Sequence, residues 1–326
     1  MKRKERLIAI SLIAFILTEI IIISNVGAHQ IKNQHSEGHI TVDLNGKGNY
    51  KSIQEAVNNA EPGSTIFINN GEYKEIIKIN KQITLIGENK DLTIISPISE
   101  KNKYAIYIGY PGVVIKDLSI KNNAPGLYTS AIKISSKRTE IINCNIYETA
   151  VGLAIWSSEN YISNCKFWAC KDEGIVLLGS SYSICNENII ENSIFYNNCD
   201  GIELQYSSNN QIKNCHFYDN SHSGIDGICS HNDNNLISNC EIYNNEVHGI
   251  YLHSSSNNKI ISCKVYDNDN ANIRIRGKSE NNKIINESLS IILINNFRER
   301  INRLLINRPN PVFERIISII DLYYSF

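Results

Sequence analysis

Apolar residues recur along the chain at a nearly constant interval. In most units of the repeat, the residues one and three places after the start are apolar, which is the period of a strand with a buried face. The most regular units begin 23 to 25 residues apart, at Gly201, Gly224, Gly249 and Asn272, and earlier ones begin at Ala131, Gly152 and Gly174. A fixed period of this length predicts an all-β solenoid of stacked coils.

A second inward position falls later in each unit and is usually a cysteine. Its occupants are Cys144, Cys165, Cys215, Cys240 and Cys263, with Ser193 in one coil. Equivalent residues of stacked coils lie about 4.8 Å apart, so these cysteines are predicted to form a buried ladder of small apolar side chains. A pair off the ladder, such as Cys170 with Cys199, could form a disulfide.

Turn residues separate the strands of each unit. The starting glycines and the Asn pairs, such as Asn209-Asn210, are predicted to supply bends with positive φ. Stacked Asn side chains would also hydrogen-bond along the axis of the solenoid.

The outward positions of the repeated strand are free to vary and carry the candidate chemistry. Two columns are expected. The first consists of Ala154, Val176, Glu203, Asp226, Tyr251 and Arg274. The second consists of Trp156, Leu178, Gln205, an irregular position at Gly227/Ile228, His253 and Arg276. Neighbours in a column should lie roughly 5 Å apart. Two adjacent carboxyl groups raise the pKa of one of them, as acid–base catalysis requires. The alternative is a solvated face on which opposite charges neutralise one another.

Candidate roles follow from these residue types. Glu203, Asp226 and Arg274 are the predicted catalytic residues. Arginine would hold an anionic sugar, and aromatic rings would stack on a sugar ring. The predicted substrate-binding residues are Trp156, Gln205, Tyr251, His253 and Arg276.

Histidines near the same strands form a second, weaker constellation. His222, His231 and His248 are expected in turns that gather along one edge, with Asp226 nearby. Imidazole and carboxylate ligands suit zinc or copper. The spacing matches no compact metal motif, and turn histidines are commonly only solvated. No cofactor is therefore predicted, and a divalent metal is the alternative.

The region from His39 to Ser96 differs from the repeats. Ser52 to Val57 is predicted to form a short helix, with Ser52 as N-cap and Glu55 three residues on. Strands are expected at 65–68, 76–79, 82–86 and 92–95. A helix here would cover the open end of the stacked sheets and prevent pairing with other chains.

The two ends of the chain have a different composition. Residues 1–28 combine a basic start, an apolar run and Val26-Gly27-Ala28, which predicts a signal peptide or an uncleaved anchor. Residues 29–38 would be a linker, 39–287 the solenoid, and 288–326 a helical cap or a tail that binds a membrane or a partner. The net charge of −1 gives no basic field for nucleic acid.

Two resemblances accompany these patterns. The run from Gly48 to Val57, with Pro62-Gly63 and Gly71-Glu72-Tyr73, resembles the opening of pectin methylesterases and other pectin-lyase-like right-handed parallel β-helices. The repeats resemble the parallel β-helix repeats of NosD-type proteins, which are exported and linked to copper-site maturation. The resemblance spans residues 40 to 287 and implies a single-stranded right-handed parallel β-helix.

The same resemblance argues against esterase activity. The segments that carry the catalytic groups of pectin methylesterases are missing, and Cys144 to Thr149 contains no Asp. The residue set of polygalacturonases is also absent. Two functions remain. The first is an exported protein, secreted or held at the cell surface, that binds or modifies a polysaccharide as a lyase or glycoside hydrolase would. The alternative is a non-enzymatic surface or NosD-like metal-site accessory protein.

Overall fold

The computed structural model describes residues 39–97, 103–126, 129–180 and 185–285. The signal peptide or anchor expected over residues 1–28, the linker at 29–38 and the helical tail at 288–326 lie outside these ranges. In the part of the chain that is described, no helix is long and apolar enough to cross a membrane.

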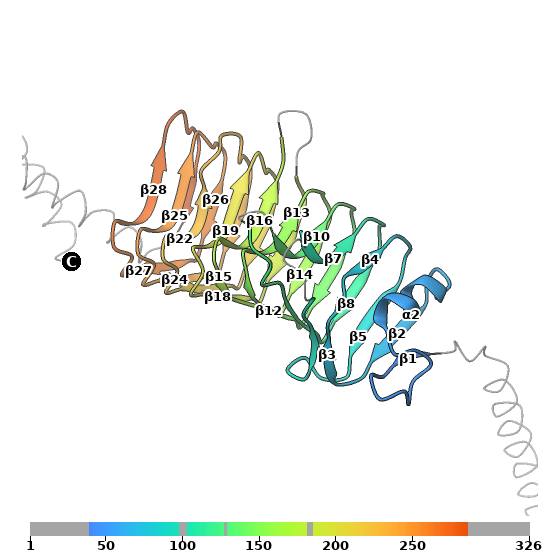
Figure 1. Ribbon diagram of the computed structural model, residues 1–326. Coiled ribbons are helices and arrows are strands. Elements are labelled where there is room, and N and C mark those ends of the chain that lie inside the picture. Colours follow the sequence, from blue (N-terminus) through green and yellow to red (C-terminus); the bar gives the residue numbers. More distant parts are fainter. Residues whose placement is uncertain (1–38, 98–102, 127–128, 181–184, 286–326) are drawn as a thin grey trace, which may run out of the picture. The chain divides into compact units, whose positions relative to one another are not determined.

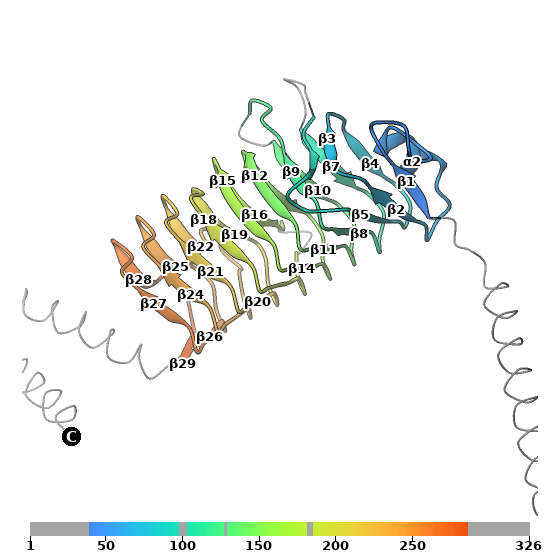
Figure 2. The ribbon, with the colours of Figure 1, turned by 90° about the horizontal axis from the view of Figure 1, so that it is seen from below.

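Three parallel sheets, one of eleven strands and two of nine, wind around one apolar interior, and most coils of the chain contribute one strand to each sheet (Figures 1 and 2). Sheet A consists of β1 (Ile40–Val42), β2 (Thr65–Ile68), β5 (Thr84–Gly87), β8 (Val114–Lys116), β11 (Glu140–Ile142), β14 (Tyr161–Ser163), β17 (Ile189–Glu191), β20 (Gln211–Lys213), β23 (Leu236–Ser238), β26 (Lys259–Ile261) and β29 (Lys283–Ile285). Sheet B consists of β3 (Gly71–Tyr73), β6 (Thr93–Ile95), β9 (Ser119–Lys121), β12 (Asn145–Thr149), β15 (Lys166–Cys170), β18 (Ile194–Tyr196), β21 (His216–Tyr218), β24 (Glu241–Tyr243) and β27 (Lys264–Tyr266). Sheet C consists of β4 (Ile77–Ile79), β7 (Tyr104–Ile108), β10 (Ser130–Ile134), β13 (Val151–Ile155), β16 (Glu173–Leu178), β19 (Asp200–Gln205), β22 (Ser223–Gly227), β25 (His248–His253) and β28 (Ala271–Arg276). The predicted all-β parallel solenoid is confirmed.

The predicted helix forms at the N-terminal end of the coils. Helix α2 (Ile53–Asn59) buries Ile53, Ala56 and Val57, and packs on β2 and β4. The hydroxyl of Ser52 accepts a hydrogen bond from the Glu55 amide at 3.2 Å, as the capping pattern predicts. The carboxylate of Glu75 accepts from the amides of the first helical turn, which satisfies donors that would otherwise lack a partner.

In the interior, side chains from the same position of successive coils stack on one another. The side chains of Phe167, Phe195 and Phe217 stack with ring centroids 4.8 and 4.7 Å apart. The cysteine ladder is buried as expected. All nine cysteines lie in the described part and none forms a disulfide, so the Cys170–Cys199 bridge is not present there.

The starting glycines do not adopt the predicted positive φ but are required for close packing between coils. Their φ angles are not positive. A Cβ on Gly201 would lie 2.5 Å from the carbonyl oxygen of Gly224 and 2.6 Å from a ring carbon of Phe217. No side chain fits such a space, so glycine is required because the next coil approaches closely.

The Asn pairs behave as predicted, and their two members have different roles. The first member, such as Asn209 (φ 58°), takes the left-handed conformation. The second member is buried and joins a ladder along the axis. Asn210 donates to the Oδ1 of Asn235 at 3.2 Å and accepts from the Nδ2 of Asn188 at 3.0 Å. Each of these side chains also accepts from the backbone amide of the preceding Asn, as from Asn188 to Asn210 at 2.9 Å, which ties adjacent coils together.

Candidate functional site

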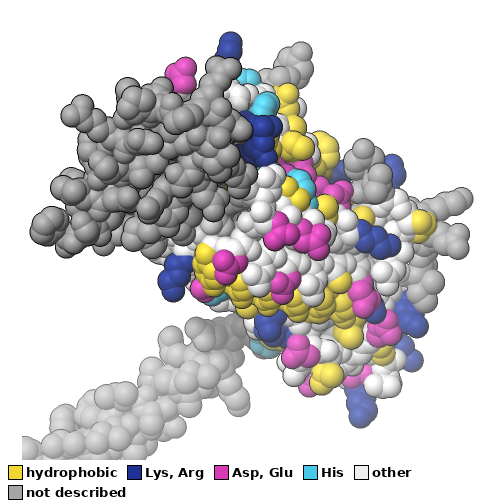
Figure 3. Space-filling view, turned by 90° about the vertical axis from the view of Figure 1, so that its left-hand side faces the viewer, with side chains coloured by type: hydrophobic (Ala, Val, Ile, Leu, Met, Phe, Trp, Pro, Cys, Tyr) yellow, Lys and Arg dark blue, Asp and Glu magenta, His cyan; other side chains and the backbone are white. Residues whose placement is uncertain are grey.

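The outward face of sheet C brings the predicted columns together. In register, Glu203 pairs with Asp226, Asp226 with Tyr251, and Tyr251 with Arg274. In the second column Leu178 pairs with Gln205, and His253 pairs with Arg276. Seen from the β28 side, basic, acidic and histidine side chains lie next to one another on the surface (Figure 3).

A third column on this face was missed by the sequence reasoning. It consists of the residues just before the starting glycines, and includes Glu173, Asp200 and His248. Strict alternation would turn these residues inward. However, the glycine itself faces the interior, because a Cβ on Gly201 would meet Phe217. The residue before it therefore faces outward. The repeated acidic residue before glycine was the signal available in the sequence.

Carboxyl groups from two adjacent coils gather in this third column and the first. The carboxyl groups of Glu173 and Glu203 hydrogen-bond each other, and the amide of Gln205 donates to Glu203. Burial, followed by the charge of Asp172, raises the pKa of Glu173 to about 9. Burial also raises the pKa of Glu203. Glu173 is thus protonated at neutral pH and donates a hydrogen bond to Glu203.

His222 links two further carboxylates. Its Nδ1 lies 2.8 Å from the Oδ1 of Asp200 and 3.3 Å from the Oδ2 of Asp226. The hydrogen bond to Asp200 raises the pKa of His222, whereas burial raises the pKa of Asp226 to about 7. These three residues form a group whose ligand atoms all lie within 4.8 Å of one another, close enough to hold one metal ion.

The other predicted histidines are placed differently from the expectation. His248 is not in a turn but is the first residue of β25, and it is buried. His231 stacks on Tyr206, which follows the opposite end of β19, so it does not join the other two. His222 and His248 do lie together, with ring centroids 6.3 Å apart, but His231 lies at the other end of the strands of sheet C, so the predicted gathering of three turn histidines does not form.

Arg274 contacts an imidazole rather than a carboxylate. Its guanidinium lies 3.1 Å from the Nε2 of His248, and the ring of Tyr251 stacks on His248 with centroids 5.0 Å apart. Burial and then the charge of Arg274 lower the pKa of His248 to about 4. His248 is therefore neutral at pH 7 and able to accept the arginine's hydrogen bond at Nε2.

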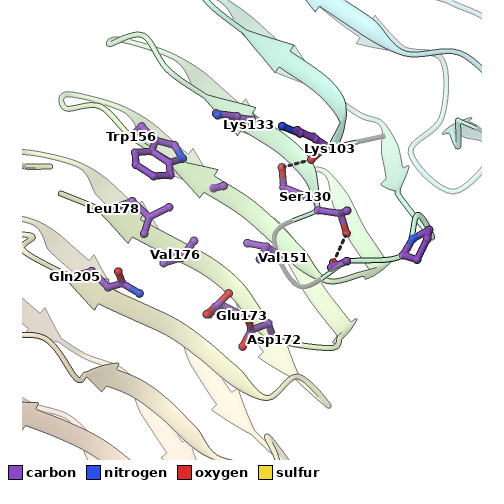
Figure 4. A pocket seen from close by; sticks show the side chains of 14 residues that line it. Lys103, Ser130, Lys133, Val151, Trp156, Asp172, Glu173, Val176, Leu178 and Gln205 are labelled. Carbon is purple, nitrogen blue, oxygen red and sulfur yellow. Dashed lines mark hydrogen bonds between the residues drawn. The ribbon is translucent and has the colours of Figure 1, made fainter. Parts of the chain in front are cut away.

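A cleft of about 830 Å³ lies on the same face, on the N-terminal side of Asp200, Glu203 and Asp226. Its floor is apolar and includes Val151, Ala154, Val176 and Leu178. Figure 4 shows Trp156 at one end, with Asp172 and Glu173 at the other.

Lysines line a further edge of this cleft. Lys103 and Lys133 both contribute to its wall, and the Nζ of Lys133 lies 5.4 Å from the ring centroid of Trp156 (Figure 4). The side chain of Trp156 is half exposed and Gln205 also lines the cleft. Of the five predicted substrate-binding residues, Trp156 and Gln205 line this space, whereas Tyr251, His253 and Arg276 do not.

Comparison with known proteins yields two family models. The model described as Pectinesterase matches residues 39–191, and the model described as Right handed beta helix region matches residues 151–299. The first covers the floor of the cleft and Glu173. The second covers Glu173, Asp200, Glu203, His222 and Asp226.

Curated relatives match the N-terminal part. Over 143 residues the chain is 29% identical to "Probable pectinesterase 56" of Arabidopsis thaliana, covering 39% of this chain and 49% of the relative. Over 134 residues it is 35% identical to "Pectinesterase" of Petunia integrifolia, covering 36% of this chain and 35% of the relative. The chain thus spans half or less of the length of these relatives.

Solved structures align with most of the chain. The A-module of a mannuronan C-5 epimerase from Azotobacter vinelandii aligns with a TM-score of 0.54 at 18% identity, covering 72% of this chain and 70% of the module. The ORF18 protein of Geobacillus virus E2 aligns with a TM-score of 0.53 at 15% identity, covering 71% and 57%. At these identities the likeness establishes the fold alone.

Proposed function

We propose that this chain, a pectin-lyase-like right-handed parallel β-helix protein with a pectinesterase-like N-terminal segment, binds an acidic polysaccharide in the cleft of sheet C and modifies it by proton transfer. The observation that carries the proposal is the cleft itself. An exposed aromatic ring, an apolar floor, two lysines and the carboxyl group of Glu173 meet in one space of about 830 Å³.

Each wall of the cleft suits one part of a uronic-acid chain. The face of Trp156 would stack on a sugar ring, since the apolar C–H face of a sugar packs well on indole. Lys103 and Lys133 would pair with sugar carboxylates. A neutral glycan would use the aromatic ring but leave both lysines without an anionic partner.

Glu173 and Glu203 would be the catalytic pair. A protonated carboxyl hydrogen-bonded to a second carboxyl group can donate a proton to a leaving oxygen or pass one on, which is the basis of acid–base cleavage of polysaccharides. Glu203 was predicted from the sequence and Glu173 was not. Glu203 does not itself line the cleft and would act through Glu173. The other two predicted catalytic residues also lie outside the lining, since Asp226 is almost fully buried and Arg274 contacts His248.

The pectinesterase-named relatives support a polysaccharide partner without defining the reaction. Export, with the chain secreted or held at the cell surface, remains part of the proposal through the predicted N-terminal segment. The NosD-like accessory role is the second candidate, and the observation that favours it is the group of Asp200, His222 and Asp226.

The test is a binding and depolymerisation screen against uronic-acid polymers and neutral polymers of equal length. We expect binding of the acidic polymers and their turnover. Trp156→Ala should weaken binding about tenfold or more. Glu173→Gln should abolish turnover while binding remains, because the amide keeps the shape but cannot donate an acidic proton.

Two variants act as controls. Trp168→Ala removes the other tryptophan of the chain, which stacks on Tyr147 in sheet B, away from the cleft. It should leave binding unchanged. Lys133→Met should weaken binding of acidic polymers only. Absence of both binding and turnover with all uronic-acid polymers would refute the proposal.

A further inference from the structure

Three side chains on neighbouring coils present their donor atoms to one point. They are Asp200, the first residue of β19, Asp226 within β22, and His222, two residues before the starting glycine of β22. The nitrogen Nδ1 of His222 lies 2.8 Å from the Oδ1 of Asp200 and 3.3 Å from the Oδ2 of Asp226. A single imidazole nitrogen therefore faces two carboxylates.

These separations resemble the edges of a metal coordination shell. Ligand atoms held about 2.1 Å from one ion are about 3.0 Å apart in octahedral geometry and about 3.4 Å apart in tetrahedral geometry. The observed separations of 2.8 and 3.3 Å fall close to these values, and the ligand atoms of all three residues lie within 4.8 Å of one another. An ion would require only small movements of the side chains.

An independent observation points to a missing partner. Asp226 is 1% exposed, and its Oδ1 has no hydrogen-bond partner among the described residues. A buried carboxylate oxygen without a partner is costly, and such atoms commonly mark a bound ion. The other oxygen of the same carboxylate already faces His222.

The charge balance favours a cation at the same point. Asp200 and Asp226 lie beside the carboxyl groups of Glu173 and Glu203 across the sheet. In the described part of the chain, His222 is the one basic side chain within 4.0 Å of either aspartate. A divalent ion would supply the positive charge that this group of carboxyl groups lacks.

The surroundings hold the ligands and leave a route for the ion. The amide of Ser223 donates to the Oδ1 of Asp200 at 2.8 Å and fixes that carboxylate. Both aspartates stand on paired strands of sheet C, so their separation is set by the backbone. The side chain of His222 is 36% exposed, which opens the group to solvent on one side.

We propose that Asp200, His222 and Asp226 bind a divalent first-row transition-metal ion, Zn²⁺ or Mn²⁺. One imidazole and two carboxylates form a mixed nitrogen and oxygen set, which suits these ions better than the all-oxygen sets of Ca²⁺ and Mg²⁺. Three protein ligands leave at least one position open for water or a substrate oxygen. The site retains His222 and Asp226 from the sequence prediction, and Asp200 takes the place of His231 and His248.

The test measures metal binding directly and without any glycan. Tag-free protein, stripped with a chelator, is dialysed against ZnCl₂ or MnCl₂, and bound metal is measured by mass spectrometry. We expect one ion per chain and a higher melting temperature with the ion bound. Asp226→Asn and His222→Gln should each weaken binding at least tenfold.

His216→Gln is the matched control. His216 pairs through Nδ1 with a single carboxylate, Glu241, at 3.4 Å, and so resembles His222 without the second aspartate. The His216→Gln variant should bind the ion as tightly as the unmodified protein does. Trp156→Ala should also retain the ion, which separates this proposal from the glycan-binding one.

CoCl₂ gives a second readout that does not depend on affinity alone. Cobalt bound by an imidazole and two carboxylates gives visible ligand-field absorption, which should be lost in His222→Gln. Circular dichroism establishes that each variant is folded, and His222→Gln carries the test if Asp226→Asn is not. No ion bound at about 1 mM metal, or equal binding by His222→Gln and His216→Gln, would overturn the proposal.

Discussion

Replacement of one member of the asparagine ladder tests how the coils are held together. Asn210→Ala removes the side chain that accepts from the Asn188 amide at 2.9 Å and from the Nδ2 of Asn188 at 3.0 Å. It also removes donation to Cys185 and Asn235, at 3.1 and 3.2 Å. In the substituted protein, the side-chain Nδ2 of Asn188 would still donate to the carbonyl oxygen of Ser157. The buried backbone N–H of Asn188 would have no partner left among the described residues.

The magnitude follows from this difference. A buried donor without a partner costs about 1–3 kcal/mol, and each of the three other bonds contributes about 1 kcal/mol or less. We therefore expect Asn210→Ala to lower the free energy of unfolding by roughly 3–5 kcal/mol. Denaturant unfolding measures the total, and native-state hydrogen exchange should show lost protection at the Asn188 amide.

The neighbouring residue provides the control. Asn209 is exposed and has φ 58°, so Asn209→Ala should cost only about 1 kcal/mol, from the left-handed conformation alone. Equal effects of the two substitutions, or a change below about 0.5 kcal/mol for Asn210→Ala, would show that the ladder does not hold the coils as described.

Further predictions concern packing and protonation. Gly201→Ala should destabilise the protein by about 2–4 kcal/mol in denaturant unfolding because its Cβ would meet Gly224 and Phe217, whereas Gly227→Ala, where the nearest atom is 3.1 Å away, should cost about 1 kcal/mol or less. Because the pKa of Glu173 is raised to about 9 from 4.5, the folded state binds the extra proton between these values, so stability should fall by about 2 kcal/mol from pH 6 to pH 8. Glu173→Gln should flatten that slope, and an unchanged slope would contradict the protonated state of Glu173 in the folded protein. For His248, whose pKa is lowered to about 4, stability should instead be lost as pH falls from 6.5 toward 4, and His248→Gln should reduce the loss in acid unfolding curves.

Much of the fold could be predicted because the same pattern of residues occurs in many successive coils. The period, the inward cysteine slot and the Asn pairs each recur over several coils, so single exceptions such as Ser193 do not obscure the pattern. The columns of side chains could also be predicted, because residues at the same position of successive repeats lie next to one another when the coils stack. The pairing of Glu203 with Asp226 is confirmed for this reason.

What could not be predicted depends on departures from the repeat. Glu173 and Asp200 face outward because the glycine after them breaks the alternation, and a rule of period two places them inside. The cleft needs Lys103 and Lys133 from earlier coils, which no local pattern connects with Trp156. The partner of Arg274 is a buried histidine, and pairing by charge alone would select a carboxylate.

The most direct test of polysaccharide binding uses Trp156 as its reporter. Trp168→Phe leaves Trp156 as the chain's single tryptophan, with its side chain half exposed in the cleft. Titration of this variant with a uronic-acid oligosaccharide should shift and saturate the tryptophan fluorescence, with an affinity that Lys133→Met weakens. Binding measured by calorimetry with no change in that fluorescence would place the glycan elsewhere and contradict the assignment of the cleft.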